Sequence, residues 1–283
     1  MREYRIRNIL VPTDFSPISR YGIHHAVRIA RLTKAHITLL NVVEPLTGGF
    51  GTSGMLGAIA AVEERMQKTS AGKLETMARS LTRRAKISLE TLSVAGRVAP
   101  LVQRISKETK ADLIVMGTHG ATGFVENLLG SNTYRVASLT RVPLLSVHKK
   151  MARYRHVVYP IRNHVHALDK FPQALMFARL FKASVHIIGL LRSGHRMSEQ
   201  SMRSQCTNVQ KLFARRGVEA EIEYTFEGFL PDVVMRRAHA YTGSLVVTVQ
   251  DADFHLVEVF QGTFTKRVLH TMLSPVLTVP SRH

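Results

Sequence analysis

Glycine and hydroxyl residues in the first half of the chain have a spacing that suits the binding of an anion. The tetrapeptide Gly-Thr-His-Gly at 117–120 directly follows the apolar run 111–116, and a Gly-Ser pair at 130–131 comes after nine more residues. Glycine allows the backbone to approach an anion closely and to adopt positive φ angles. This spacing therefore predicts a phosphate-binding loop that follows a buried strand.

A helix is expected directly after this loop, over residues 132–139. The first N–H groups of a helix have no partner inside it, and the helix dipole favours negative charge at that end. The N–H groups of Gly130, Ser131 and Asn132 would thus face an anion. Strand, glycine loop and helix start together indicate a cradle for the phosphates of a nucleotide.

A carboxylate, Asp14, ends the run Val-Pro-Thr-Asp at the end of the first apolar stretch. In an open parallel sheet, ligands bind beyond the carboxyl ends of the strands, at the point where the strand order reverses. If the first and fourth strands are neighbours, Asp14 faces the loop at 117–120. Its carboxylate would repel phosphate, but it can accept hydrogen bonds from a ribose hydroxyl or a base amine.

Each of these residues also has a purely structural interpretation. Asp14 and Ser16 could cap the helix that follows them, and Gly117 and Gly120 could serve only a tight turn. Because the spacing and the strand context are right for all of them together, we favour the nucleotide site.

The elements that must position these residues are predicted from short apolar strands that alternate with helical patterns. Continuous β-branched runs suit strands buried on both faces, and the alternation is typical of a parallel, doubly wound sheet. The glycine-rich segment 45–57 is expected to be a crossover loop, with a lid over a ligand as the alternative. The expected strands are 8–12, 36–43, 87–94, 113–117 and 143–147, and the expected helices are 17–33, 58–85, 99–109 and 132–139.

The chain repeats this plan once. We place the boundary in the polar, basic stretch 149–153, which predicts two domains, residues 1–150 and 151–283. The matching segments are 7–14 with 155–162, 26–40 with 174–188, 111–116 with 243–248 and 140–147 with 273–279. The strands expected in the second half are 156–160, 185–190, 218–224, 245–249 and 276–279.

The run Val-Pro-x-Asp at 11–14 and the spacing Gly-x2-Gly-x9-Gly-Ser at 117–131 resemble the ATP-binding branch of the universal stress protein family. The resemblance covers both halves, so the chain is similar to a tandem, two-domain member. It implies an α/β fold of two tandem Rossmann-like (adenine nucleotide alpha hydrolase-like) domains, each a five-stranded parallel sheet of order 3-2-1-4-5 with helices on both faces. It also implies that the two halves pack as an intramolecular pseudo-dimer, often through their last strands.

The same resemblance implies which residues surround the nucleotide, and these come from four short stretches. Those beside the adenosine are Pro12, Thr13 and Asp14, with backbone groups near Val42 at the adenine. Those along the ribose and the phosphates are Met116, Gly117, His119, Gly120, Gly130, Ser131, Asn132 and Thr133. Asn132 departs from the small or hydroxyl residue that the family often has there. The implied ligand is ATP or ADP, with Mg²⁺ as an optional companion near Asp14 or Ser131.

The second half departs from this pattern. Arg162 stands where the first half has Asp14, and Asp251 and Asp253 stand where the glycine loop would be. Carboxylates at that place would repel phosphates. We therefore predict that the second half does not bind ATP in the usual way, and that Arg162 forms an ion pair with Asp251 or Asp253.

Two functions follow from this interpretation. In the first, the chain is a nucleotide-dependent regulatory or stress-response protein: ATP or ADP in the first domain sets the conformation of the pseudo-dimer, and an unknown protein partner reads it. In the second, it is a weak ATPase or an ATP-using transferase on the same fold. The sequence has no Gly-Lys-Ser/Thr motif, arginine finger or evident base to activate water. Any hydrolysis would therefore be slow, and no catalytic residue is assigned.

Charge and composition limit the partners and the compartment. The net charge of +19 divides as +12 over residues 1–150 and +7 over residues 151–283. A solvated basic surface explains this charge most simply, and the alternative is attraction to an acidic partner, either nucleic acid or lipid headgroups. The single cysteine, Cys206, excludes an internal disulfide, and no metal site is expected. We find neither a transmembrane segment nor a signal-peptide core, so we expect a cytoplasmic protein, with a homodimer as a further option.

Overall fold

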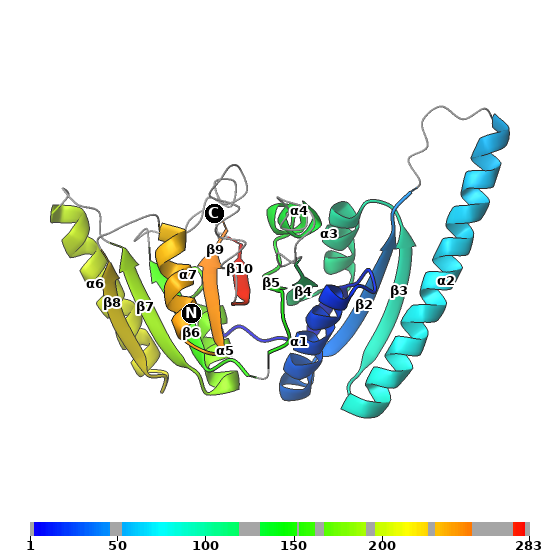
Figure 1. Ribbon diagram of the computed structural model, residues 1–283. Helices are drawn as coiled ribbons and strands as arrows, with labels where there is room; N and C mark the ends of the chain where they lie inside the picture. Colours follow the sequence, from blue (N-terminus) through cyan, green and yellow to red (C-terminus); the bar gives the residue numbers. More distant parts are fainter. Residues whose placement is uncertain are drawn as a thin grey trace.

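The protein, represented by a computed structural model, alternates strands and helices through both halves of the chain (Figure 1). The structure describes residues 3–45, 53–118, 131–151, 153–161, 167–190, 196–225, 230–250 and 274–280. The first half contains the strands β1 (Asn8–Pro12), β2 (His36–Val43), β3 (Leu89–Ala95), β4 (Leu113–Gly117) and β5 (Leu144–Val147), and the helices α1 (Pro17–Thr33), α2 (Ser53–Ala85), α3 (Val98–Glu108) and α4 (Ser131–Leu139).

The second half follows the same order of elements as far as it is described. Its strands are β6 (His156–Ile161), β7 (Ser184–Leu190), β8 (Ala220–Thr225), β9 (Ser244–Val249) and β10 (Val276–Val279). Its helices are α5 (Phe171–Phe181), α6 (Arg196–Ala214) and α7 (Leu230–Ala240).

Helix α1 shows how local sequence sets the bounds of an element. The side chain of Ser16 accepts a hydrogen bond from the backbone N–H of Ser19 at 3.1 Å, which caps the helix start, and Pro17 occupies the first turn. Both residues are favourable at those positions. The helix ends at Thr33, and the C-cap residue Lys34 adopts the left-handed conformation with φ of 60°. The predicted cap and bounds are confirmed.

The ten strands form one continuous sheet in the order β3-β2-β1-β4-β5-β10-β9-β6-β7-β8. Each half therefore has the strand order 3-2-1-4-5, and all pairs within a half are parallel. The halves meet through β5 and β10, which pair antiparallel with Leu145 opposite Leu277. The predicted fold class and the pairing of the last strands are confirmed.

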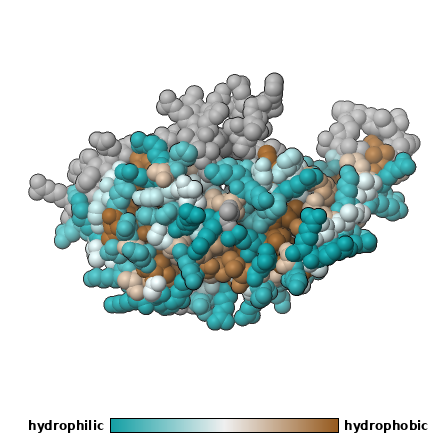
Figure 2. Space-filling model, turned by 60° about the horizontal axis from the view of Figure 1, so that its bottom comes forward, coloured by the Kyte–Doolittle hydropathy of each residue, from teal (hydrophilic) through white to brown (hydrophobic). Residues whose placement is uncertain are grey.

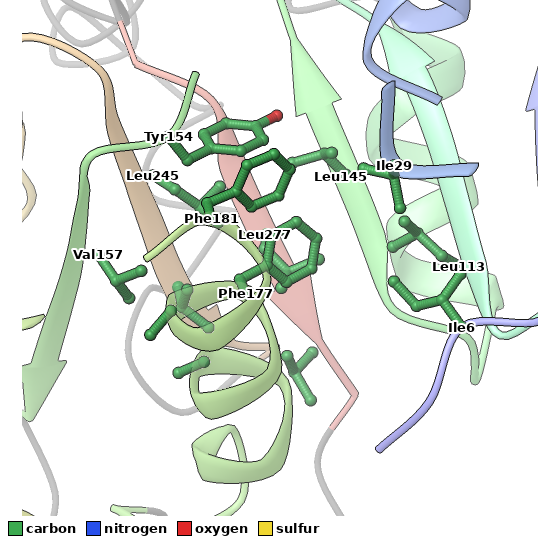
Figure 3. Packing of buried hydrophobic residues seen from close by; sticks show 14 of the residues in the cluster. Ile6, Ile29, Leu113, Leu145, Tyr154, Val157, Phe177, Phe181, Leu245 and Leu277 are labelled. Carbon is green, nitrogen blue, oxygen red and sulfur yellow. The ribbon is translucent and has the colours of Figure 1, made fainter. Parts of the chain in front are cut away.

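Successive side chains along each strand point to opposite faces of the sheet, and helices cover both faces. On one face, a single hydrophobic cluster runs through both halves and takes in α1, α2, α5 and α6 (Figure 3). On the other face, α3 and α4 pack over one cluster in the first half, and α7 packs over a separate one in the second half. The shared cluster therefore joins the two halves, beyond the hydrogen bonds of β5 and β10.

A buried polar contact also links the halves. The ring of His25 in α1 hydrogen-bonds to the hydroxyl of Tyr154, which precedes β6, and its other nitrogen lies 3.0 Å from the carbonyl oxygen of Lys149. Tyr154 packs edge-on against Phe177 and Phe181 of α5. Burial lowers the pKa of His25 and raises the pKa of Tyr154, so both groups are neutral at neutral pH.

The bounds of α2 differ from the prediction. The helix begins at Ser53 rather than at residue 58, so Gly54 and Gly57 are helical and not part of a loop. Glycine is unfavourable in a helix by only about 1 kcal/mol relative to alanine, and Met55 and Leu56 between them are good helix formers. Residues 46–52, to which a lid would be confined, lie outside the described residues.

Candidate functional site

The ends of β1 and β4 lie side by side, which is the condition that the predicted site required. Ile9 is opposite Leu113 and Leu10 is opposite Ile114 in a parallel pair. On their other sides these strands pair with β2 and β5, so the direction in which the chain builds the sheet reverses between β1 and β4. This is the place where open α/β sheets bind ligands.

Asp14 lies at this edge, and it is exposed. Its carboxylate accepts a hydrogen bond from the backbone N–H of Ser16 at 3.0 Å. Partial desolvation alone would raise the pKa of Asp14, but hydrogen bonds from Ser16 and Ser19 outweigh it and hold the pKa below its ordinary value. Asp14 is therefore an anion held at the start of α1, as either a cap or a ligand-binding group requires.

The residues around Asp14 are fixed by a network of short hydrogen bonds. Thr13 is buried, its backbone N–H donates to the carbonyl oxygen of Leu40 at 2.8 Å, and its hydroxyl lies 2.9 Å from that of Ser19. The Thr13 hydroxyl also accepts from the N–H of Phe15, which has a φ of 65°. The turn that carries Asp14 is thus held by hydrogen bonds within the protein.

Asn41 near the end of β2 belongs to the same network, and sequence reasoning missed it. Its side-chain nitrogen donates to the carbonyl oxygen of Thr13 at 2.8 Å. Its Oδ1 atom is buried and has no hydrogen-bond partner among the described residues. Such an acceptor is costly unless a donor reaches it. A polar residue inside an otherwise apolar strand was the signal in the sequence.

Gly117 is required by packing, whatever else it does. A Cβ atom there would lie 2.3 Å from the carbonyl oxygen of Ile18 and 2.8 Å from the Cα of Ser19. Gly22 faces it, because a Cβ on Gly22 would lie 3.0 Å from the Gly117 nitrogen. The first turns of α1 therefore touch the end of β4 backbone to backbone, which explains both glycines without a ligand.

The structure places the remaining predicted residues as follows. Pro12 and Met116 are buried at the ends of β1 and β4, Val42 is half-buried in β2, and Ser131, Asn132 and Thr133 form the first turn of α4. The helix packs beside α3 over the cluster that contains Met116. His119, Gly120 and Gly130 lie outside the described residues, so the cradle itself is not described.

The corresponding edge of the second half is built differently. In the register of the repeat, Lys170 corresponds to Gly22 and Val249 to Gly117. Lys170 is fully buried; its ammonium donates to the carbonyl oxygen of Pro160 at 2.6 Å and lies 4.9 Å from the centre of the Tyr159 ring. In the register of the repeat, a long buried side chain therefore stands where the first half has Gly22.

The first helix of the second half is shorter as well. Helix α5 has 11 residues, whereas α1 has 17, and the residues before it, 167–170, form turns. Whereas α1 packs on β4, the main strand contact of α5 is with β6. The ion pair expected between Arg162 and Asp251 or Asp253 lies outside the described residues.

Comparisons with known proteins match the first half and the whole fold. The model of the Universal stress protein family matches residues 5–148. Universal stress protein MJ0531 of Methanocaldococcus jannaschii is 31% identical over 145 residues, which are 50% of this chain and 82% of that protein. Universal stress protein MJ0577 of the same organism is 25% identical over 156 residues, 51% of this chain and 96% of that one.

A solved structure covers both halves. The crystal structure of a universal stress protein from Archaeoglobus fulgidus superposes with a TM-score of 0.72 at 17% sequence identity, over 98% of this chain and 97% of its own. At that identity the similarity concerns the fold alone. None of the described helices is long and apolar enough to cross a membrane.

Proposed function

Because this chain belongs to the universal stress protein family, we propose that its first domain, residues 1–150, binds ATP or ADP and that this occupancy regulates a stress response. The observation that carries the proposal is the adjacency of β1 and β4, with Asp14 at one strand end and the start of the glycine loop at the other. Family membership supports the same role.

The residues present suit an adenine nucleotide. Asp14 is an exposed anion and can accept hydrogen bonds from a ribose or a base, and the unpaired acceptor of Asn41 lies one strand away. The N–H groups at the start of α4, including that of Asn132, would hold phosphates. Mg²⁺ would take oxygen ligands, for which Asp14 and Ser131 are the candidates.

Nucleotide binding is restricted to the first domain in this proposal. In residues 151–283 the buried ammonium of Lys170 and the shortened α5 replace the close contact that frames the edge of the first half. The loop that corresponds to 117–120 carries Asp251 and Asp253 instead of glycines. The second domain would then transmit the state of the first to a protein partner, through the shared core.

Calorimetric titration of nucleotide-stripped protein with ATP and Mg²⁺ tests this proposal. We expect one site per chain. The variant Asp14→Asn should bind about tenfold more weakly, because it loses a charged acceptor worth about 1.4 kcal/mol. Asparagine can still accept the hydrogen bond from Ser16, so the turn should keep its structure, and a thermal melt checks this.

Arg162→Gln provides the matched control, because it neutralises the charge at the corresponding position of the second half. It should leave the affinity and the stoichiometry unchanged. Two equivalent sites per chain would contradict the restriction to the first domain, and an unaltered affinity of Asp14→Asn would contradict the role of Asp14. ADP release during the titration would favour the weak ATPase over a purely regulatory protein.

A further inference from the structure

A groove of about 540 Å³ lies between the two halves, on the face that α1 and α5 cover. Its walls are residues 3–7 and the end of α1 from the first half, and α5 with Arg216 from the second. Figure 2 shows hydrophobic patches on this face, one of them in its lower middle, with hydrophilic residues between them. The volume is within the range of about 300–1,000 Å³ that is typical of small-molecule sites.

The floor of the groove is apolar. Ile6, Phe171 and Leu175 are buried there, and Met176 and Leu180 are half-buried along the wall that α5 forms. Opposite them, Leu32 at the end of α1 is 50% exposed and extends the apolar surface. An apolar surface of this kind is stabilised when a hydrophobic ligand covers it.

The rim of the groove is strongly basic. Arg5, Arg7, Arg179 and Arg216 line it, whereas Glu3 is the sole acidic residue among the described residues that do so. The Glu3 carboxylate is already paired with the Arg5 guanidinium at 2.7 Å. The net charge of the lining is therefore +3, which complements an anion.

At two positions of the groove lining, this side has smaller residues than the other half of the repeat. In the register of the repeat, Ile6 corresponds to Tyr154 and Thr33 to Phe181. Tyr154 and Phe181 pack together with ring centres 4.8 Å apart, and Tyr154 is only 1% exposed (Figure 3). The smaller Ile6 and Thr33 leave the equivalent place open.

We propose that this groove binds a small amphiphilic anion, a single unbranched acyl chain that ends in a carboxylate. The chain would lie along Ile6, Leu175 and Met176. The carboxylate would bind the guanidinium groups of Arg7 and Arg216, whose planar shape suits bidentate contact. Arg5, paired with Glu3, and Arg179, which donates to the Arg216 carbonyl oxygen, would add positive charge nearby. A second copy of this protein is a poor occupant, because each copy carries a net charge of +19. The inference does not depend on the nucleotide site.

Titration followed by NMR of methionine methyl groups tests this binding in the full chain. The Met176 signal, assigned with Met176→Leu, reports on the groove, and Met66 on α2 reports on a surface outside it. Decanoate should shift the signal of Met176 and leave that of Met66 in place. Acetate, which lacks the chain, and decyltrimethylammonium, which has the opposite charge, should each bind at least about tenfold more weakly.

Two variants separate the apolar part from the charged part. Thr33→Phe copies the second half and should fill the groove, so that decanoate no longer shifts Met176. Should Thr33→Phe fail to fold, the double variant Arg5→Gln with Arg7→Gln still tests the charge, and it should weaken decanoate binding about tenfold. Arg79→Gln on α2 removes an exposed arginine elsewhere and should change nothing.

Several outcomes would overturn the proposal. The first is no shift of Met176 at millimolar decanoate, and the second is an equal shift of Met66 and Met176. Equal affinities for decanoate and decyltrimethylammonium would show that the arginines play no part. Tight binding of an acidic amphipathic peptide without binding of decanoate would assign the groove to a protein partner instead.

Discussion

The carboxyl ends of β1 and β6 hold equivalent places in the two halves, yet different chemistry completes them. In the first half, Gly22 and Gly117 let the start of α1 touch the end of β4. In the second half, the buried ammonium of Lys170 reaches Pro160 and α5 starts later. The strand order is the same in both halves, and one hydrophobic cluster runs through them. The same fold is therefore compatible with different residues at the carboxyl ends of its strands, and function has to be argued from those residues.

The largest change in stability should come from a side chain placed into the backbone contact between α1 and β4. Gly117→Val would place a side chain within 2.3 Å of the Ile18 carbonyl oxygen, so we expect the free energy of unfolding to fall by about 3 kcal/mol. Urea denaturation measures it. Gly72→Ala is the matched control, because nothing lies within 4 Å of its Cβ and α2 should be stabilised by up to about 1 kcal/mol.

The stability of Gly117→Val also decides whether this variant can serve as a test of nucleotide binding. A variant that unfolds part of α1 would lose the proposed nucleotide site for structural reasons, so Asp14→Asn is the variant that tests the site. A fully stable Gly117→Val would instead mean that α1 can move away from β4, and the comparison of the two halves would lose its main physical basis.

A smaller loss of stability is expected when Lys170, the counterpart of Gly22 in the second half, is substituted. Lys170→Ala removes a buried side chain, leaves a cavity and deprives the Pro160 carbonyl of a donor, so the free energy of unfolding should fall by about 2 kcal/mol. Lys170→Met keeps most of the volume and should lose less. Equal losses for both variants would show that the hydrogen bond, and not the packing, holds this edge.

The smallest change in stability is expected for the contact between His25 and Tyr154, which links the two halves, and it depends on pH. His25 corresponds to Gln173 in the second half, so His25→Gln makes the halves alike there. Because burial lowers the pKa of His25 in the folded state, the unfolded chain takes up a proton first as the pH falls through about 6.5, and stability is lost. His25→Gln should cost about 1 kcal/mol near pH 7.5, through the lost bond to Tyr154.

The difference in the free energy of unfolding between wild type and His25→Gln should then be smaller near pH 5.5 than near pH 7.5. Urea denaturation at both pH values measures it. His24, His156 and His186 also have lowered pKa values, each through desolvation first, and they keep a residual acid sensitivity in the variant. A constant difference at both pH values would contradict the assignment of this titration to His25.

The sequence predicted the elements well because their signals are local. Segment 113–117 is a continuous apolar run, 36–43 is mostly apolar, and Ser16 and Pro17 mark the start of α1, so these bounds are confirmed. The start of α2 was wrong, since Gly54 and Gly57 resemble a loop when only local preference is considered.

The site was less predictable because it depends on distant contacts. The polar Asn41 within a mostly apolar strand is visible in the sequence, but its bond to Thr13 and the burial of Lys170 depend on contacts between segments distant in the chain. The groove between Ile6 and α5 depends on side-chain volumes across the two halves. The predicted roles of His119, Gly120 and Gly130 stay predictions.

The antiparallel pair of β5 and β10 has a consequence for biosynthesis. Ser146 pairs with Val276, about 130 residues further along the chain. At roughly 5–20 residues per second, a ribosome needs on the order of ten seconds to bridge that distance. Through that interval the nascent first half has an open strand edge, which can pair with other chains. The rate of translation, rather than the final stability, therefore sets how long the growing chain is prone to aggregate.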